Sequence, residues 1–509
     1  MENVAGPYIL PGLIDAHVHI ESSMLIPSEF ARLAVVHGTT ATVSDPHEIA
    51  NVLGLDGVDF MVSNGADTPF RFHFGAPSCV PATGFESSGA TLNSAEIESL
   101  LSRKDIYYLS EMMNFPGVLF GDEEVHKKLD LAKKFNKPID GHAPGLNATD
   151  IAKYAAAGIS TDHECTTIEE AIAKINAGMH ILIREGSAAR NFDALVPLLA
   201  THPEKIMFCS DDKHPDDLVA GHINLLIRRA LQSGYNLISV LRACTLNPVN
   251  HYKMNCGLLQ PGDNADFILV DSLENFNISK TFIGGEIVAE NGISYLKSVS
   301  CDAPNHFLAP EIRLTDLAVK AASGKMRVIE AYDGDLLTGN HFADPLIKDG
   351  FVISDVDNDV LKITVINRYQ PSKPAFAFIK GFGFKKGAMA STVAHDSHNI
   401  ICIGTNDDDM VKVINMLVAE KGGIAVTDGE SAEILPLPVA GLMSASDGYQ
   451  AAQKYEEINA KAIALGGTLK APFMTMSFMA LLVIPELKLS DKGLFDGNKF
   501  AFTSLFAEE

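Results

Sequence analysis

Between Tyr8 and about Asp212, short apolar runs alternate with longer segments in which apolar residues recur at helical spacing. Such continuous apolar runs are typical of strands buried on both faces of a parallel sheet. About eight strands, each followed by a helix, predict an α/β fold, and we favour a metal-dependent (β/α)8 TIM barrel over residues 9–255. An open, doubly wound sheet would give the same alternation, because periodicity does not show closure. The runs are YILPGLIDAHVHI, GTTATVSD, RFHFGAPS, IYYLSEMMNF, KPIDGHA, GISTDHE, HILIRE and IMFCSDD.

The segments between these runs carry signals for helix ends. Residues 29–36 place apolar side chains on one side, with Pro27 ahead and Gly38 behind, as helix ends prefer. Thr167 stands three residues before Glu170, which is the spacing of a capping box, and isoleucines follow at helical spacing. We therefore expect a helix in each of these two segments.

Polar side chains gather where the predicted strands end. One such residue alone is more often a helix cap or a solvated surface group. A barrel, however, brings the carboxyl ends of all its strands to one face, where active sites form. The whole set therefore predicts a single site, and its members are His17, His19, Asp45–Glu48, Glu111, His142, His163, Glu164, Arg184, Glu185, Asp211 and Asp212.

Imidazole and carboxylate groups at these positions suit Zn²⁺, Mn²⁺ and Fe²⁺. His17 and His19 are two residues apart, so in a strand both point to the same face and could hold one cation. A divalent cation lowers the pKa of its bound water from 15.7 to about 7, which makes hydroxide available at neutral pH. The pattern favours metal-assisted hydrolysis.

Two cations about 3.5–4 Å apart need an anion between them, and Glu111 at the end of the fourth run is the candidate. His142 and His163, which end the fifth and sixth runs, would serve the second cation. Asp211, which ends the eighth, could bind a cation and also accept a proton from the attacking water.

The pattern changes after about Cys256. Short strands separated by Gly and Asn turns predict a β-sandwich segment over residues 256–300. The polar stretch Ser298–Leu314 predicts a linker, and residues 315–509 predict an α+β domain with helices near Asp407–Glu420 and Gly448–Leu465. Within it, the HDSHN segment at 395–399 follows a predicted strand. It is either a tight turn or a flap over the site.

Composition narrows the class of partners and the compartment. With 64 acidic and 40 basic residues the net charge is −24, which repels nucleic acid and anionic membranes, so we expect neither as a partner. The seven cysteines include no CxxC pair, as expected in a reducing compartment. The first residues lack a signal-peptide pattern, and no apolar run reaches transmembrane length. A cytoplasmic location is predicted.

Several longer segments occur in a fixed order: PGLIDAHVHIESSM, SDPHEIANVLG, EMMNFPGV, DGHAPG, TDHE, IREGSAARN and CSDDKHP. They are followed by ACTLNPVNHYKMNCGLLQPGDNADFILV and, near the C-terminus, by MASTVAHDSHNIICIGTND. Together they resemble the adenine deaminase family of the amidohydrolase superfamily, in its bacterial and archaeal type, over nearly the whole chain. SDPHE together with AHDSHN distinguishes this family from other amidohydrolases.

The resemblance implies a binuclear centre, with Mn²⁺ or Fe²⁺ as the usual cations; zinc is compatible with the ligand types. The implied ligands are His17, His19, Glu111, His142, His163 and Asp211. The implied reaction, in purine salvage or catabolism, is hydrolytic deamination of adenine to hypoxanthine and ammonia by a metal-bridged hydroxide. Asp211, Glu164 and Glu111 are the implied catalytic groups, with Glu164 favoured over Glu48 for protonating the purine ring. The expected assembly is a homodimer.

A second group of residues is expected around the substrate. Some of them have structural alternatives: the SDPHE residues could form a turn around Pro46, and Arg184 could make a buried ion pair with Glu185. The expected substrate-binding residues are His47, Glu48, Arg184, Glu185, Ser187, Asp212, His395 and His398.

Family members carry about one more sheet's worth of sequence before YILPG, so residues 1–8 are expected to be a remnant of the N-terminal half of the sandwich. Two other functions stay open. One is a related hydrolase that opens a cyclic amide such as a hydantoin or dihydropyrimidine. The other is a catalytically impaired relative that lacks its N-terminal sheet.

Overall fold

The first half of the chain is built on parallel strands that curl round so that the last lies beside the first. The computed structural model describes residues 7–507. The Ser160 amide donates to the Ile139 oxygen at 2.9 Å, which joins the two parallel sheets, and the Asp211 amide donates to the His17 oxygen at 2.9 Å. In the described residues, one sheet contains β2 (Leu13–Val18), β3 (Thr39–Ser44), β4 (Arg71–Ala76), β5 (Tyr108–Met112) and β6 (Ile139–Gly141), and the other contains β7 (Thr161–Asp162), β8 (His180–Arg184) and β9 (Ile206–Cys209).

Helices follow these strands along the chain, as the sequence predicts. The helix expected at 29–36 runs instead from Pro27 to Ala34, because the chain tightens into a short 3₁₀ turn before Gly38, whose φ of 81° ends it. The Thr167 hydroxyl accepts a hydrogen bond from the Glu170 amide and begins the helix expected there. The helices are α1 (Pro27–Ala34), α2 (His47–Leu53), α3 (Leu55–Ala66), α4 (Ser94–Leu101), α5 (Phe115–Phe120), α6 (Glu123–Lys134), α7 (Ala148–Ala156), α8 (Ile168–Asn176), α9 (Phe192–Leu195), α10 (Leu198–Thr201), α11 (Pro215–Ala220), α12 (Ile223–Gln232), α13 (Leu237–Ala243) and α14 (Leu246–Tyr252).

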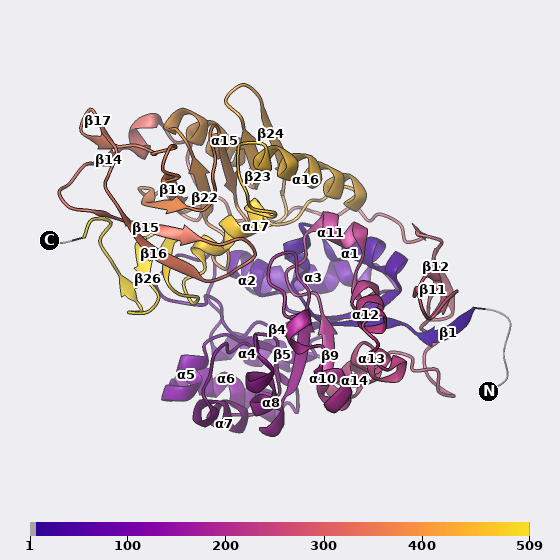
Figure 1. Cartoon of the computed structure of the whole chain (residues 1–509). Helices are drawn as coiled ribbons and strands as arrows, with labels where there is room; N and C mark the ends of the chain where they lie inside the picture. The colour runs from indigo at the N-terminus through magenta and orange to yellow at the C-terminus, as the bar shows by residue number, and fades with distance from the viewer. Residues whose placement is uncertain (1–6, 508–509) are drawn as a thin grey trace.

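A small antiparallel sheet lies beside the parallel strands, near the N-terminal end in Figure 1. Its first strand pairs with a strand more than 250 residues later, with Tyr8 opposite Val270. Residues 1–6 of the expected remnant at 1–8 lie outside the described part, and the division of the chain into domains stays a prediction. In order across the sheet, the strands are β1 (Tyr8–Pro11), β10 (Phe267–Val270), β11 (Ile278–Ile283), β12 (Glu286–Glu290) and β13 (Ile293–Ser294).

The last part of the chain has mixed α+β content. Both expected helices are present: α15 (Asp407–Glu420) has the predicted bounds, and α16 (Gly448–Ile463) ends two residues early. A shorter α17 (Pro472–Ser477) precedes a three-stranded sheet of β25 (Leu487–Ser490), β26 (Gly493–Asp496) and β27 (Ala501–Phe502). The main sheet has the order β16 (Thr338–Ala343), β15 (Met326–Ala331), β20 (Ala375–Lys380), β19 (Leu361–Ile366), β22 (Ile400–Gly404), β21 (Ala388–Ser391), β23 (Gly423–Thr427) and β24 (Ala432–Pro436).

This C-terminal part packs directly on the first part (Figure 1). The Ser444 amide donates to the Met24 oxygen at 2.8 Å, and the Gly448 amide donates to the Glu29 carboxylate at 2.8 Å. Apolar side chains from both parts, among them Phe30 and Phe473, belong to one continuous buried core. Removing either part would expose this shared apolar surface to water. The two parts therefore hold each other in place.

A buried ion pair fixes the ends of β6 and β7. The Lys174 amine on α8 lies 2.9 Å from the Asp162 carboxylate, with both side chains fully buried, and donates to the Ala143 oxygen at 2.7 Å. Asp162 also accepts from the amides of Ala143 and Glu164, at 3.0 and 2.9 Å. Ala143 directly follows His142 and Glu164 directly follows His163, so the ion pair between Lys174 and Asp162 helps to fix the positions of the two imidazoles.

We predict that Lys174→Met lowers the free energy of unfolding by about 3–5 kcal/mol, because it leaves the Asp162 carboxylate buried without its cation. Urea denaturation measures the change. Lys153→Met is the matched control: Lys153 is exposed on α7 beside Asp150, so its loss should change stability by no more than about 0.5 kcal/mol. Equal effects of the two variants would contradict the assigned role of Lys174.

Candidate metal centre and active site

A cavity lies between the carboxyl ends of the parallel strands and the C-terminal part. Most residues that the sequence places at strand ends line it, even though they are separated by up to about 200 positions. The lining residues are His19, His47, Glu48, Glu111, Met113, His142, His163, Glu164, Arg184, Asp211, Asp212, Leu336, His395, Asp396, Phe478 and Leu481.

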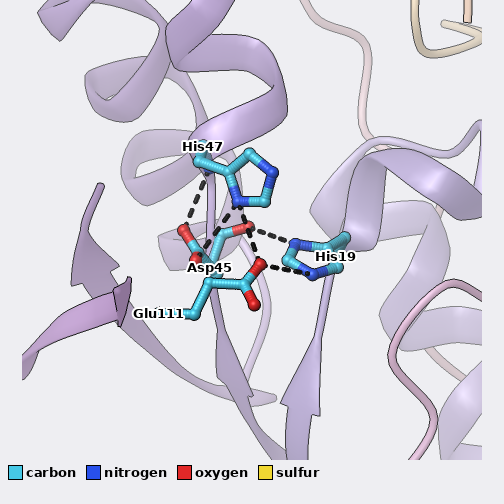
Figure 2. Close-up of side chains that lie close together, drawn as sticks. All are labelled: His19, Asp45, His47 and Glu111. Carbon is cyan, nitrogen blue, oxygen red and sulfur yellow. Dashed lines mark hydrogen bonds and ion pairs between the residues drawn. The ribbon is translucent and has the colours of Figure 1, made fainter. Parts of the chain in front are cut away.

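The Glu111 carboxylate, at the end of β5, stands between two groups of histidines. Its Oε1 lies 3.3 Å from His19 Nε2 and 3.6 Å from His47 Nδ1. Its Oε2 lies 2.9 Å from His142 Nδ1 and 3.1 Å from His163 Nε2. Figure 2 shows the first side of this arrangement, with His19 and His47 both directed at Glu111. Each oxygen therefore faces a different group, as a bridging carboxylate requires.

His17, His19 and Asp211 form the first group. The Nε2 atoms of the two histidines are 3.2 Å apart, and Asp211 Oδ1 lies 3.4 Å from His17 Nε2 and 3.1 Å from His19 Nε2. Atoms bound at about 2.1 Å by one tetrahedral cation lie about 3.4 Å from each other. The spacing and the donor types fit a divalent cation.

A contact from outside the cluster orients one of these ligands, His19. His19 Nδ1 lies 3.3 Å from the Asp45 backbone oxygen, which leaves Nε2 free to bind a cation. His142 Nε2 is buried and finds no hydrogen-bond partner in residues 7–507, whereas its Nδ1 faces Glu111. The donor set on both sides of Glu111 thus fits cations, and Glu111 would touch both.

A buried network positions β2 against the end of β9. The Asp15 carboxylate accepts from the Ser210 amide at 3.0 Å and lies 2.8 Å from His222 Nε2. Asp211, the next residue, has φ of 55°, a left-handed conformation that an L-residue adopts at a cost of about 1–3 kcal/mol. In this backbone conformation the Asp211 side chain points towards His17 and His19.

Arg184 supplies a fixed positive charge in this cavity. Its guanidinium forms a close ion pair with Glu164 and donates to Asp211 Oδ2 at 2.7 Å. Burial alone would raise the pKa of Glu164, but Arg184 and the neighbouring histidines hold it below its ordinary value. Burial likewise opposes ionisation of Glu111, but His142, His163 and His19 keep its pKa well below the usual range. Both carboxylates are therefore ionised.

The SDPHE segment forms a turn around Pro46, and two of its residues, His47 and Glu48, also line the cavity. Asp45 Oδ1 accepts a hydrogen bond from the His47 amide at 3.1 Å, which closes this turn just before α2, although the helix itself has no side-chain cap at Pro46. The His47 ring, however, faces both Asp45 and Glu111 (Figure 2), and its Nε2 lies 3.5 Å from Glu48. Glu48 in turn makes close contacts with His395 and His398 of the C-terminal part.

Three of the expected substrate-binding residues lie outside the cavity lining, namely Glu185, Ser187 and His398. The Glu185 carboxylate pairs with Arg229 at 3.0 Å on the other side of β8, because consecutive residues of a strand point to opposite faces. The Ser187 hydroxyl donates to Asp217 and accepts from the His214 amide, so it fixes the start of α11. The proposed ion pair of Arg184 with Glu185 is also absent among the described residues, since Arg184 pairs with Glu164.

The apolar wall that the C-terminal part contributes to the cavity was not predicted from the sequence. Leu336, Phe478 and Leu481 line the cavity, yet they sit in segments that read as ordinary core. The buried Lys488 amine donates to the backbone oxygens of Leu336 and Phe478 at 2.7 and 3.0 Å. Burial lowers the pKa of Lys488 to about 7. This lysine ties together two segments of the wall.

Comparison with known proteins decides the family. Residues 8–288 match the model described as "Amidohydrolase family", and residues 335–501 match "Adenine deaminase C-terminal domain". The chain is 52% identical to the adenine deaminase of Salinibacter ruber over 100% of this chain and 93% of that protein. The chain belongs to the adenine deaminase family. It is also 53% identical to the adenine deaminase of Methanosarcina barkeri, over 99% of this chain and 93% of the relative.

The predicted family is thus confirmed, and the two matched regions cover both parts of the structure that meet at the cavity. Among solved structures, a β-aspartyl dipeptidase from Fervidobacterium islandicum AW-1 is 18% identical, with a TM-score of 0.45 over 57% of this chain and 85% of that one. Within residues 7–507, no helix is both long enough and apolar enough to cross a membrane.

We predict that Mn²⁺ stabilises the fold and that a chelator reverses the effect, because the cations bind only the assembled ligand set. At a free concentration 100 times its Kd, one bound cation adds about 2.7 kcal/mol to the free energy of unfolding. Thermal unfolding with and without Mn²⁺, together with metal analysis, measures both stability and stoichiometry. Mg²⁺ is the control, since it prefers oxygen ligands and should stabilise much less. Binding of one equivalent only would contradict the bridging role of Glu111.

Proposed function

We propose that this chain hydrolyses adenine to hypoxanthine and ammonia at the cavity between its two parts. The proposal rests above all on Glu111, whose two oxygens face separate groups of histidines and so can join two cations. Identity above 50% to curated adenine deaminases over nearly all of the chain supports adenine as the substrate.

The proposed ligand set is the one expected from the sequence, with Mn²⁺ as the first candidate and Fe²⁺ or Zn²⁺ as alternatives. Bound cations would supply hydroxide at neutral pH by lowering the pKa of water. His17, His19 and Asp211 would hold one of them, and His142 and His163 the other. Glu111 would connect the two groups.

Asp211 would accept a proton from the nucleophilic water. Its Oδ1 faces His17 and His19, while Oδ2 is held by Arg184, so the carboxylate is fixed by both oxygens. Deamination also requires a proton to reach the purine and its leaving amino group. Glu164 stays the candidate for that transfer. Because Arg184 keeps it ionised, it must first accept the proton it delivers.

The C-terminal wall would hold the flat purine. Phe478, Leu481 and Leu336 contribute apolar side chains to the lining of the same cavity as the ligand cluster. Polar groups at the edge of the cavity, among them His47 and Asp212, would bind the purine's nitrogen atoms. Glu185 and Ser187 are left out of this proposed binding set, since neither lines the cavity.

Several finer features belong to the same proposal. The curled parallel strands are proposed to form one closed (β/α)8 barrel, supported by the bridge between Val18 and Asp211. A cytoplasmic location is supported by seven unpaired cysteines within the described residues. The homodimer also stays a prediction, which light scattering of the purified protein would test.

We expect Mn²⁺-loaded protein to convert adenine to hypoxanthine and to release ammonia in equal amounts. Loss of adenine's ultraviolet absorbance and an ammonia assay measure the two products. Hydantoin and dihydrouracil serve as competing substrates, and ring opening of either faster than adenine deamination would favour the cyclic-amide hydrolase. Full metal loading without conversion of any of them would favour an impaired relative.

Glu111→Gln should lower kcat/KM for adenine by about 100-fold or more, because the amide keeps the shape of the bridge but loses its charge. Metal analysis should show a loss of bound cation while circular dichroism stays unchanged. Glu98→Gln is the control, since Glu98 pairs with Lys134 on the surface. Near-normal turnover of Glu111→Gln would exclude a carboxylate shared by two cations.

A further inference from the structure

A buried His–Glu–His cluster joins the two parts of the molecule at the edge of the cavity. Glu48 comes from the first turn of α2, whereas His395 and His398 come from the loop between β21 and β22. His395 Nδ1 and His398 Nε2 each contact a different oxygen of the Glu48 carboxylate. All three side chains are at most 3% exposed. The contacts hold the 395–398 loop against the barrel.

The hydrogen bonds fix the state of His398. The Ala394 amide donates to His398 Nδ1 at 3.3 Å, so this nitrogen carries a lone pair. In a neutral imidazole the other nitrogen then carries the hydrogen. His398 Nε2 therefore donates to Glu48 and has no lone pair for a cation. The cluster fits a hydrogen-bonded unit better than a third metal site.

His395 differs from His398 because it lines the cavity and its second nitrogen has no partner among the described residues. Its Nδ1 is engaged by Glu48, while Nε2 is buried and finds no partner within residues 7–507. The ring stacks on Phe478, with centroids 5.0 Å apart and planes at 22°. His395 and Phe478 both line the cavity that contains the ligand cluster. A buried ring nitrogen without a partner calls for one from a ligand.

The surroundings favour a hydrogen on that nitrogen. Burial alone would lower the pKa of His395, but the Glu48 and Asp212 carboxylates raise it to about 9. Two further buried atoms of the 395–398 loop lack a partner in the described chain, Asp396 Oδ2 and Ser397 Oγ, and of these two residues only Asp396 lines the cavity. Asp396 Oδ1 faces His47 at 3.9 Å. Adenine offers ring nitrogens as acceptors and a flat face for Phe478.

We propose that His395 binds the purine by a hydrogen bond from Nε2 to a ring nitrogen, and that Glu48 and His398 position His395 without touching the substrate. This assignment rests on adenine as the substrate of the proposed function. It gives the C-terminal part a direct role in recognition, since the barrel provides the cation ligands and the 395–398 loop provides a contact to the base.

The test compares adenine with 1-deaza-, 3-deaza- and 7-deazaadenine, each of which lacks one acceptor nitrogen. Wild-type protein loaded with Mn²⁺ should bind one analogue about 10- to 100-fold more weakly than adenine, the range for a hydrogen bond with a charged partner. His395→Ala should weaken the binding of adenine by the same factor, and the variant should no longer bind that analogue more weakly than adenine. Its preference among the other two should not change.

Further variants separate positioning from contact. His398→Gln keeps an N–H for Glu48 and should retain the discrimination, whereas His398→Leu should lose most of it, chiefly through KM and not kcat. His251→Ala is the matched control, because His251 contacts Ser160 away from the cavity and should behave as wild type. Melting curves confirm that each variant folds. Should His395→Ala fail to fold, the same comparison of adenine with the three analogues is made with His395→Gln.

Two results would overturn the inference. In the first, His395 variants keep the full discrimination against every analogue. In the second, metal analysis finds a third cation that His398→Leu releases. Failure of the proposed function itself looks different, because wild-type protein would then fail to deaminate adenine before any variant is compared.

Discussion

The active-site architecture depends on placing ionised carboxylates and imidazoles together where their side chains are buried. A buried carboxylate is tolerated only where partners offset the loss of hydration, and Glu111 finds them in His19, His47, His142 and His163. These partners come from four different strand ends. One carboxylate therefore imposes a common location on residues that are distant in the sequence, and this convergence makes a binuclear centre physically reasonable.

Contacts around the cluster hold its residues in position. Asp15 anchors β2 to the end of β9, and Lys174 with Asp162 fixes the residues that follow His142 and His163. Arg184 then offers a permanent positive charge beside Asp211. Ligands held in this way need little rearrangement when a cation arrives, which is how outer contacts strengthen metal binding.

Much of the cluster was predictable, because each ligand ends a recognisable apolar run and parallel strands bring such ends together. Among the expected site residues that do not line the cavity, two lie just beyond the strands. Glu185 follows Arg184 directly and so points to the opposite face, and Ser187 is taken up by the turn into α11. The apolar wall gave no signal, since Phe478 and Leu481 look like core residues until the fold places them over a cavity.

The sequence by itself determined the strand–helix alternation, the polar strand ends, the chemistry of the donor set and the family. Those features are local or depend on residue type. Only the tertiary structure decided which atoms face each other: Arg184 with Glu164 and not Glu185, Glu48 with His395 and His398 across about 350 positions, and β9 beside β2. The reason is that such contacts depend on how the two parts pack through a shared apolar core, and periodicity along a chain carries no information about that packing.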